Sequence, residues 1–164
     1  ETDTLLNKKS GLLGLTGSND LRAVIEGAHR GEERSALGLA MFVYRVRKYI
    51  GAYTAALDGQ VDAVVFSAGI GENSSIIRGL ILEPLKGMGM VVSSAVNEAT
   101  VGGRQGDISD PSSRVRLLVI PTDEELAIAQ QTLQASGVVA AGGGGVRLGM
   151  APSRRVCGPA QQRP

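Results

Sequence analysis

The sequence predicts an α/β architecture in which strands and helices alternate along the chain. Residues 61–67, "VDAVVFS", and residues 114–122, "RVRLLVIPT", are short, rich in Val and Leu and bounded by turn formers, which is typical of buried strands. Each is followed by a segment in which apolar residues have helical spacing, and a long helical pattern precedes the first strand.

The composition allows one ordinary domain and argues against two classes of partner. Of the 164 residues, 43% are hydrophobic, which is enough for a core. Lys and Arg number 17 against 16 Asp and Glu, so no nucleic acid or membrane partner is expected. No apolar run reaches the roughly 20 residues of a membrane span, and no signal segment is found, so we expect a cytoplasmic protein. The single cysteine, Cys157, excludes an internal disulfide.

Two helices are expected before the first strand. Residues 18–27 open with turn formers and close on Gly27, which predicts a short helix capped by Ser18 or Asn19. Residues 32–57 predict a long helix, because apolar residues recur every three or four positions and so share one face: Leu39, Phe42, Val46, Ile50, Tyr53 and Leu57.

After the first strand, residues 74–85 predict a helix, residues 87–113 short strands and turns, and residues 123–133 a helix that follows the second strand. The composition changes after Ser136, where four consecutive glycines are joined by scattered Pro and Arg. Such a segment cannot bury enough apolar surface to offset the entropy of ordering it. We therefore expect one domain at residues 1–136 and a disordered or non-native tail at residues 137–164.

The segment "AGIGENS", residues 68–74, is the first candidate site, because it leads from a buried strand into a helix. A helix start presents unpaired N–H groups, and glycines let a ligand approach the main chain. We expect Asn73 or Ser74 to cap the next helix. The segment is not a dinucleotide fingerprint, because Ser74 replaces the third glycine, and it lacks the Gly-Lys-Ser/Thr of a P-loop. The alternative is a tight turn that uses glycine for its backbone freedom.

Glu72 fits neither alternative well. A carboxylate at this position would repel phosphate oxygens, so we expect it to face a ribose, a hydrogen-bond donor or a metal ion.

The acids that follow the second strand form another candidate site. Thr122 and Glu125 have the spacing of a capping box, which leaves Asp123 and Glu124 for other roles. One carboxylate would suffice for Mg²⁺, which usually takes its other ligands from substrate phosphates and water. The alternative is that acids in a first helical turn only interact with the helix dipole.

Asp20 and Arg22, in "SNDLR", form the third candidate site. The guanidinium of Arg22 could stack on an aromatic base, and Asp20 could accept hydrogen bonds from sugar hydroxyls. The alternative is an ordinary helix start with an acid at its positive end.

Four segments, in this order, resemble consecutive blocks of acetate kinases, a family that includes propionate and butyrate kinases: "LLNKKSGLLGLTGSNDLR", "RKYIGAYTAAL", "VDAVVFSAGIGENSSIIR" and "VIPTDEELAIA". The resemblance covers about residues 5–134. It implies the C-terminal nucleotide-binding half of an actin-like, ribonuclease H-like ATPase fold. It also implies a homodimeric enzyme that uses ATP and Mg²⁺ to phosphorylate acetate, giving acetyl phosphate and ADP.

The resemblance also implies roles for particular residues. Asp20, Leu21 and Arg22 match the adenosine-contacting loop, and Glu124 matches the magnesium-associated glutamate. The second nucleotide loop is matched by Gly69, Ile70, Gly71, Glu72 and Asn73. The family's catalytic residues would precede Glu1, so we expect a fragment with no catalytic residue, inactive by itself.

Three alternatives remain open. The chain could be a non-catalytic module that binds ADP or ATP, or one that mediates dimerisation. It could belong to a propionate or butyrate kinase. It could also be a dinucleotide-binding oxidoreductase domain, although the missing third glycine argues against this.

Overall fold

The structure is a computed structural model and describes residues 2–136. The tail expected at residues 137–164 lies outside the described residues. The chain up to Asp123 forms one compact unit, and helix α8 (Glu124–Ala135) belongs to a second unit and is described by itself. Within residues 2–136, no helix is long and apolar enough to cross a membrane.

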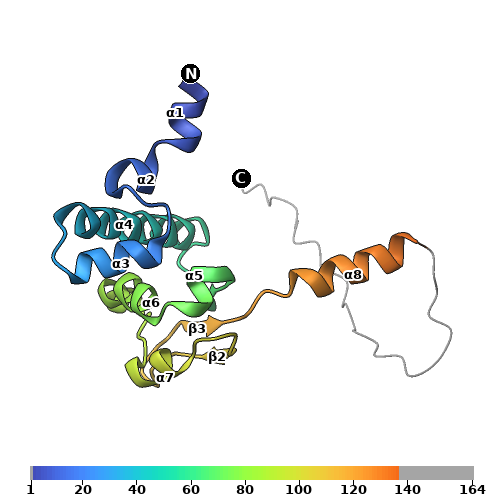
Figure 1. The fold of residues 1–164 in the computed structure, drawn as a ribbon. Coiled ribbons are helices and arrows are strands. Elements are labelled where there is room, and N and C mark those ends of the chain that lie inside the picture. The colour runs from blue at the N-terminus through green and yellow to red at the C-terminus, as the bar shows by residue number, and fades with distance from the viewer. Residues whose placement is uncertain (1, 137–164) are drawn as a thin grey trace, which may run out of the picture. The chain divides into compact units, whose positions relative to one another are not determined.

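The first unit alternates helices and strands, as the sequence predicts (Figure 1). Its elements are α1 (Thr2–Lys8), α2 (Gly11–Thr16), α3 (Leu21–His29), α4 (Glu33–Ala56), β1 (Ala63–Phe66), α5 (Ala68–Asn73), α6 (Ser75–Leu82), the 3₁₀ helix η1 (Glu83–Met88), α7 (Ser94–Ala99), β2 (Gly106–Asp107) and β3 (Arg116–Val119).

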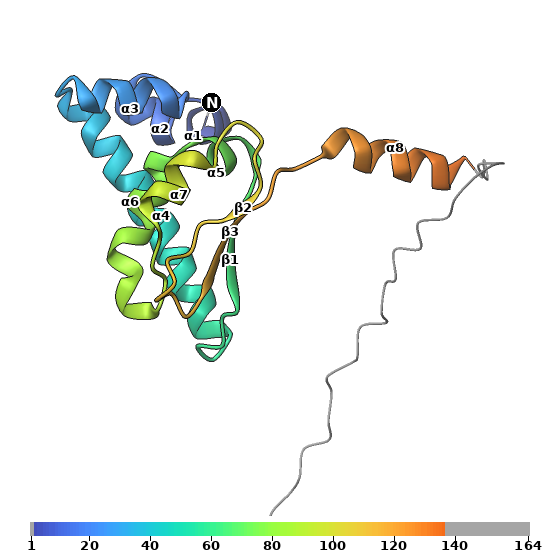
Figure 2. The ribbon, with the colours of Figure 1, turned by 90° about the horizontal axis from the view of Figure 1, so that it is seen from below.

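The three strands form one sheet in the order β1-β3-β2. β1 and β3 are parallel, with Val64 opposite Leu117 and Phe66 opposite Val119. β2 pairs antiparallel with β3. Because β1 and β3 are parallel, their carboxyl ends lie at the same edge of the sheet, so the segments that follow them are close in space. Both strands predicted from the sequence are confirmed. Figure 2 shows α4 and α6 on one side of this sheet.

Helix α4 extends almost as predicted, but its inner face differs in part. Leu39, Phe42, Val46 and Ile50 pack against the core as expected. Tyr53 and Leu57 are 65% and 54% exposed, so assigning them to the dry face was wrong. A 24-residue helix is about 36 Å long, whereas a four-residue strand spans about 13 Å, so the last turns of α4 extend past the sheet.

The core lies between the sheet and helices α3, α4 and α6. It joins Val24 of α3, Val43 of α4, Ile77 of α6, Phe66 of β1 and Leu117 of β3 in one buried cluster. Burial of such side chains is the main source of stability in a domain of this size.

Two local predictions need correction. The first short helix is α3, and Asp20 rather than Ser18 or Asn19 is its N-cap. Residues 87–113 contain a helix, α7, which the sequence did not indicate because its six residues show no apolar periodicity.

Candidate functional site

The chain turns sharply where β1 ends. Ala68 adopts a φ of +58°, which is unusual for a residue other than glycine. The hydroxyl of the preceding residue, Ser67, donates a 2.7 Å hydrogen bond to the carbonyl oxygen of Ile120, just past the end of β3. The turn is therefore tied to the neighbouring strand.

Residues 68–73 form the short helix α5, so the prediction of an open loop was wrong. The helix is closed by a side chain, since Asn73 Nδ2 donates a 2.9 Å hydrogen bond to the carbonyl oxygen of Gly69. Ser74 caps α6, because its hydroxyl oxygen accepts a 3.3 Å hydrogen bond from the Ile77 N–H. Gly71 lies against β1, where an added Cβ would stand 3.4 Å from the carbonyl carbon of Phe66.

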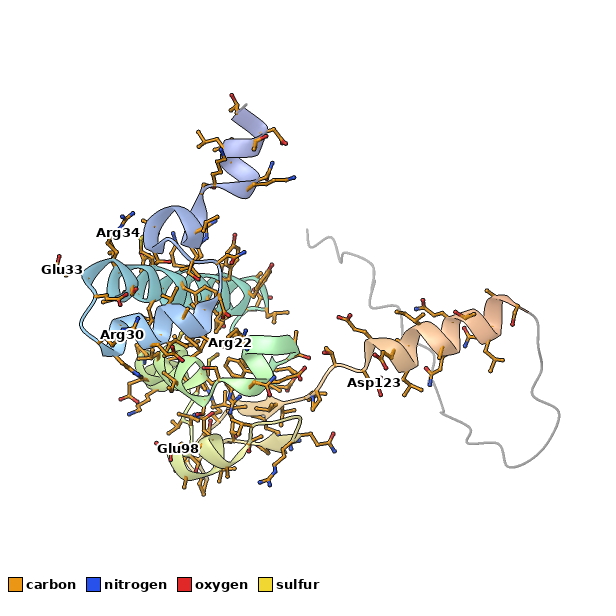
Figure 3. The ribbon with its side chains drawn as sticks, in the orientation of Figure 1. Arg22, Arg30, Glu33, Arg34, Glu98 and Asp123 are labelled. Atoms are coloured by element: carbon orange, nitrogen blue, oxygen red, sulfur yellow. The ribbon has the colours of Figure 1, made fainter. Side chains whose placement is uncertain are left out.

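Asp20 and Arg22 form a closed pair at the start of α3. One carboxylate oxygen of Asp20 accepts from the Arg22 N–H at 2.9 Å and from Arg22 Nε at 3.0 Å. The other accepts from Nη2 at 2.8 Å. These hydrogen bonds hold the pKa of Asp20 below its usual value and raise that of Arg22. The pair fixes the direction of an otherwise exposed guanidinium. Figure 3 labels Arg22 at the start of α3.

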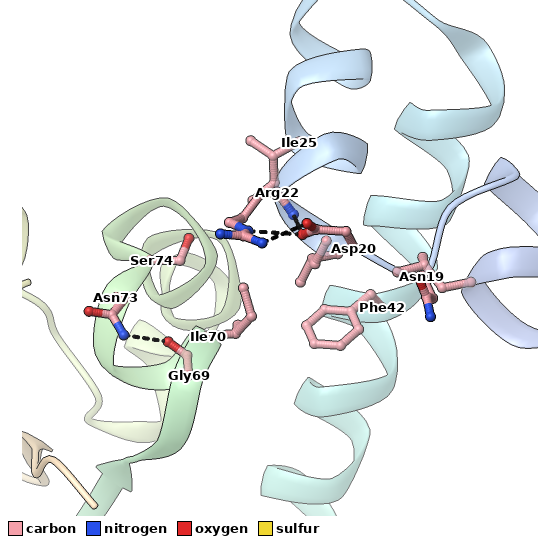
Figure 4. Close-up of a pocket in the computed structure, with 11 residues that line it drawn as sticks. Asn19, Asp20, Arg22, Ile25, Phe42, Gly69, Ile70, Asn73 and Ser74 are labelled. Atoms are coloured by element: carbon pink, nitrogen blue, oxygen red, sulfur yellow. Dashed lines mark hydrogen bonds and ion pairs between the residues drawn. The ribbon is translucent and has the colours of Figure 1, made fainter. Parts of the chain in front are cut away.

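A cavity of about 820 Å³ lies between these two segments (Figure 4). Its apolar walls come from α2, α3, α4 and α5, with Phe42 facing Ile70. Its polar groups come from Asn19, Asp20, Arg22, Asn73 and Ser74. The structure thus brings together Asp20, Leu21, Arg22, Gly69, Ile70 and Asn73, six of the eight residues predicted to bind nucleotide.

Gly71 and Glu72 are the two that do not line the cavity. Glu72 is only 9% exposed, and one of its oxygens accepts hydrogen bonds from the backbone N–H of Thr122 at 2.7 Å and from the Thr122 hydroxyl at 3.1 Å. A backbone hydrogen bond from Ala68 adds to these, and together they hold the pKa of Glu72 below its usual value. Glu72 therefore faces protein donors and joins the ends of β1 and β3.

Thr122 is thus bound to Glu72, a contact that the capping-box prediction did not anticipate. Glu124, the predicted magnesium residue, lies in the first turn of α8 and is exposed. No group of three or more His, Cys, Asp or Glu side chains gathers as a metal site within residues 2–136.

Sequence reasoning missed five lining residues, namely Leu12, Asn19, Ile25, Phe42 and Ser74. Phe42 was assigned to the inner face of the long helix, which is correct. The helical spacing could not reveal that this part of the face meets a cavity, because that depends on the position of α5, which is remote in sequence.

Comparisons with known proteins found relatives that match most of this chain. The model of the acetokinase family matches residues 1–130. The acetate kinase of Methanosarcina thermophila is 52% identical over 133 residues, which cover 80% of this chain and 32% of that protein. The acetate kinase of Carboxydothermus hydrogenoformans is 46% identical over 134 residues, 82% of this chain and 33% of that protein. The chain spans about a third of the length of the curated relatives it matches.

Solved structures give the same result. The acetate kinase of Porphyromonas gingivalis matches with a TM-score of 0.73 and 45% identity, over 80% of this chain and 33% of that one. A propionate kinase from Francisella tularensis matches with a TM-score of 0.72 and 36% identity, over 79% of this chain and 32% of that one. These neighbours confirm the α/β fold class expected from the sequence.

Proposed function

The chain belongs to the acetokinase family, and from this premise we propose that its described residues hold the adenosine part of ATP. The whole enzyme would transfer a phosphoryl group from ATP to acetate, giving acetyl phosphate and ADP. The observation that carries the proposal is that residues 20–22 and 69–73, which are remote in sequence, contribute to one cavity.

The cavity suits adenosine in size and chemistry. Ligand sites usually have volumes of roughly 300–1,000 Å³, and this one has about 820 Å³. Phe42 and Ile70 offer apolar surfaces to a flat base. Arg22 can lie over the base, since its guanidinium is planar and its direction is fixed by Asp20. Both Asp20 oxygens already accept hydrogen bonds, so a sugar hydroxyl would use the remaining lone pair of this carboxylate.

Magnesium fits the same proposal through Glu124. Mg²⁺ is commonly held by one or two carboxylates together with phosphate oxygens and water. Glu124 supplies an exposed carboxylate for such a metal ion. When bound, Mg²⁺ neutralises charge on the phosphates. Glu124→Gln should weaken the Mg²⁺ dependence of nucleotide binding, and ADP titrations with and without Mg²⁺ would measure this.

These residues would contribute positioning to phosphoryl transfer. Such reactions also need cationic groups that neutralise charge in the transition state, and the residues named here do not supply them. We expect the 164-residue chain alone to make no acetyl phosphate. A hydroxamate trap that detects turnover above a boiled control would contradict this.

The proposal is tested by calorimetric titration of the chain with ADP. Saturable binding, with NAD giving no signal, supports the adenosine site and excludes the oxidoreductase alternative. Absence of ADP binding by a folded chain would contradict the proposal. The preferred carboxylate substrate is tested separately, by comparing turnover of acetate and propionate in the full-length enzyme. This comparison is needed because one structural relative is a propionate kinase.

A second role, self-association, is favoured by the exposed face of α4. Its large apolar side chains with about half or more of their surface exposed are Leu37, Met41, Tyr44, Tyr49 and Tyr53. Contiguous exposed apolar surface often marks a protein contact. Light scattering of the full-length enzyme, with and without Tyr44→Ser, would test whether this face joins two subunits of a homodimer.

A further inference from the structure

Arg78 is the most completely buried charged residue of the described chain. It lies in α6, and its exposed fraction is 0%. It does not line the adenosine cavity. Burying a guanidinium without compensation is costly, so its surroundings must supply strong acceptors.

All five N–H groups of this guanidinium are used. Nη1 donates to the carbonyl oxygens of Gly71 and Glu72, both at 2.8 Å. Nη2 donates to the carbonyl oxygens of Asn97 at 2.8 Å and Thr100 at 2.6 Å. Nε donates to Oδ1 of Asn97 at 2.7 Å. An arginine has five donors in a rigid planar fork, so no other side chain could satisfy this set of acceptors.

The acceptors belong to two helix ends. Gly71 and Glu72 are in the last turn of α5, and Asn97 and Thr100 are at the end of α7. Helix C-termini carry unpaired carbonyl groups, which favour a cation. No carboxylate forms an ion pair with Arg78 in the described part of the chain, so carbonyl dipoles compensate its charge. Burial accordingly lowers the pKa of Arg78.

Two further hydrogen bonds lie beside this anchor. Oδ1 of Asn73 accepts a 3.2 Å hydrogen bond from the N–H of Gly102, which follows α7. The amide of Asn97 donates from Nδ2 to the carbonyl oxygen of Ser75 at 2.9 Å. Helix α5 is thus tied to α6 and to the end of α7 by a network centred on Arg78.

We infer that Arg78 is a positioning residue for the adenosine site, and that it acts by fixing α5. The inference rests on the proposed function. With the carbonyl groups of Gly71 and Glu72 anchored to Arg78, Gly69, Ile70 and Asn73 remain on the cavity wall. Short helices are marginal in water without tertiary support. Without the anchor, α5 would lose both bonds to Arg78 and depend on those of Glu72 to Thr122 and of Asn73 to Gly102.

The test is Arg78→Lys in the 164-residue chain, with ADP affinity measured by calorimetry and folding by thermal denaturation. Lysine keeps the charge but has three donors at a single point, so it cannot bind both helix ends. We expect the Kd for ADP to rise about tenfold, which corresponds to about 1.4 kcal/mol. Arg104→Lys, an exposed arginine after α7, is the matched control and should keep the original Kd.

Comparing kcat with the KM values for ATP and acetate separates a positioning role from general destabilisation. In a full-length acetokinase that carries this segment, Arg78→Lys should raise KM for ATP about tenfold while kcat and the KM for acetate change by less than about twofold. A misfolded variant would instead lose kcat. If kcat and both KM values change together, the inference is wrong.

The outcomes distinguish the two proposals. If the unmodified chain does not bind ADP, the adenosine proposal fails. If it binds ADP and folded Arg78→Lys binds it equally well, only the role of Arg78 fails. Should Arg78→Lys not fold, Asn97→Ala decides, because it loosens the network by removing the Nε acceptor and the bond to Ser75 while the four carbonyl bonds of Arg78 remain. An increase of about threefold in Kd supports the inference, and an unchanged Kd overturns it.

Discussion

Shortening Ile70 to alanine should weaken ADP binding about sevenfold. Ile70 lines the cavity from α5 and is half-buried in the structure. The substitution removes three carbon atoms, worth roughly 0.8 kcal/mol each when fully buried. Protein already covers about half of the Ile70 side chain, so only the other half can be buried by a bound base. The substitution should therefore cost about 1.2 kcal/mol of binding free energy, which is about sevenfold in Kd. Calorimetric titration with ADP measures this change.

Ile76→Ala is the matched control for this substitution. Ile76 lies in α6, is 45% exposed and does not line the cavity, so the same chemical change should leave the Kd within about twofold. If Ile70→Ala and Ile76→Ala bind ADP equally well, the base does not contact Ile70, and the reasoning that places adenosine against α5 is refuted.

Two further predictions concern stability. Gly38→Ala should destabilise the chain by about 1–3 kcal/mol, because the new Cβ would stand 2.3 Å from Cγ2 of Thr16. Gly51→Ala in the same helix places its Cβ in open space, so it should stabilise the chain by about 0.5–1 kcal/mol. Thermal denaturation of both variants tests this, and equal effects would contradict the close packing of α2 on α4. Glu72→Gln should lower the Tm at neutral pH, where the carboxylate is ionised and bound to Thr122. The pKa of Glu72 in the folded chain lies below 4.5, so the stabilisation by its carboxylate is present above pH 4.5 and is lost as the pH falls through that pKa. The difference in Tm between the unmodified chain and Glu72→Gln should therefore narrow on acidification. A gap that stays constant from pH 7 to pH 3 would contradict the role given to this carboxylate.

The sequence was sufficient for the features that depend on local periodicity. β1 and β3 were predicted from short apolar runs bounded by turn formers, and the extent of α4 from the helical spacing of its apolar residues. The resemblance to acetate kinases added the pairing of residues 20–22 with residues 69–73, which no local pattern contains.

The features that the sequence did not show depend on contacts between distant residues. Helix α5 was expected to be a loop because glycines disfavour helices, yet Arg78 and Asn73 bind its carbonyl groups. Helix α7 has no periodic apolar face, and Arg78 joins its end to α6. Glu72 and Thr122 are 50 residues apart. Tertiary hydrogen bonds of this kind override local propensity, and a single sequence carries no sign of them.

The proposal that two distant segments form one adenosine site can be tested most directly by following both during a single titration. The amide signals of Arg22 and Ile70 in the ¹⁵N-labelled chain should shift together as ADP is added and should fit one Kd, because both residues line the same cavity. If only one of the two signals responds, or if they follow different binding curves, the segments do not share a ligand.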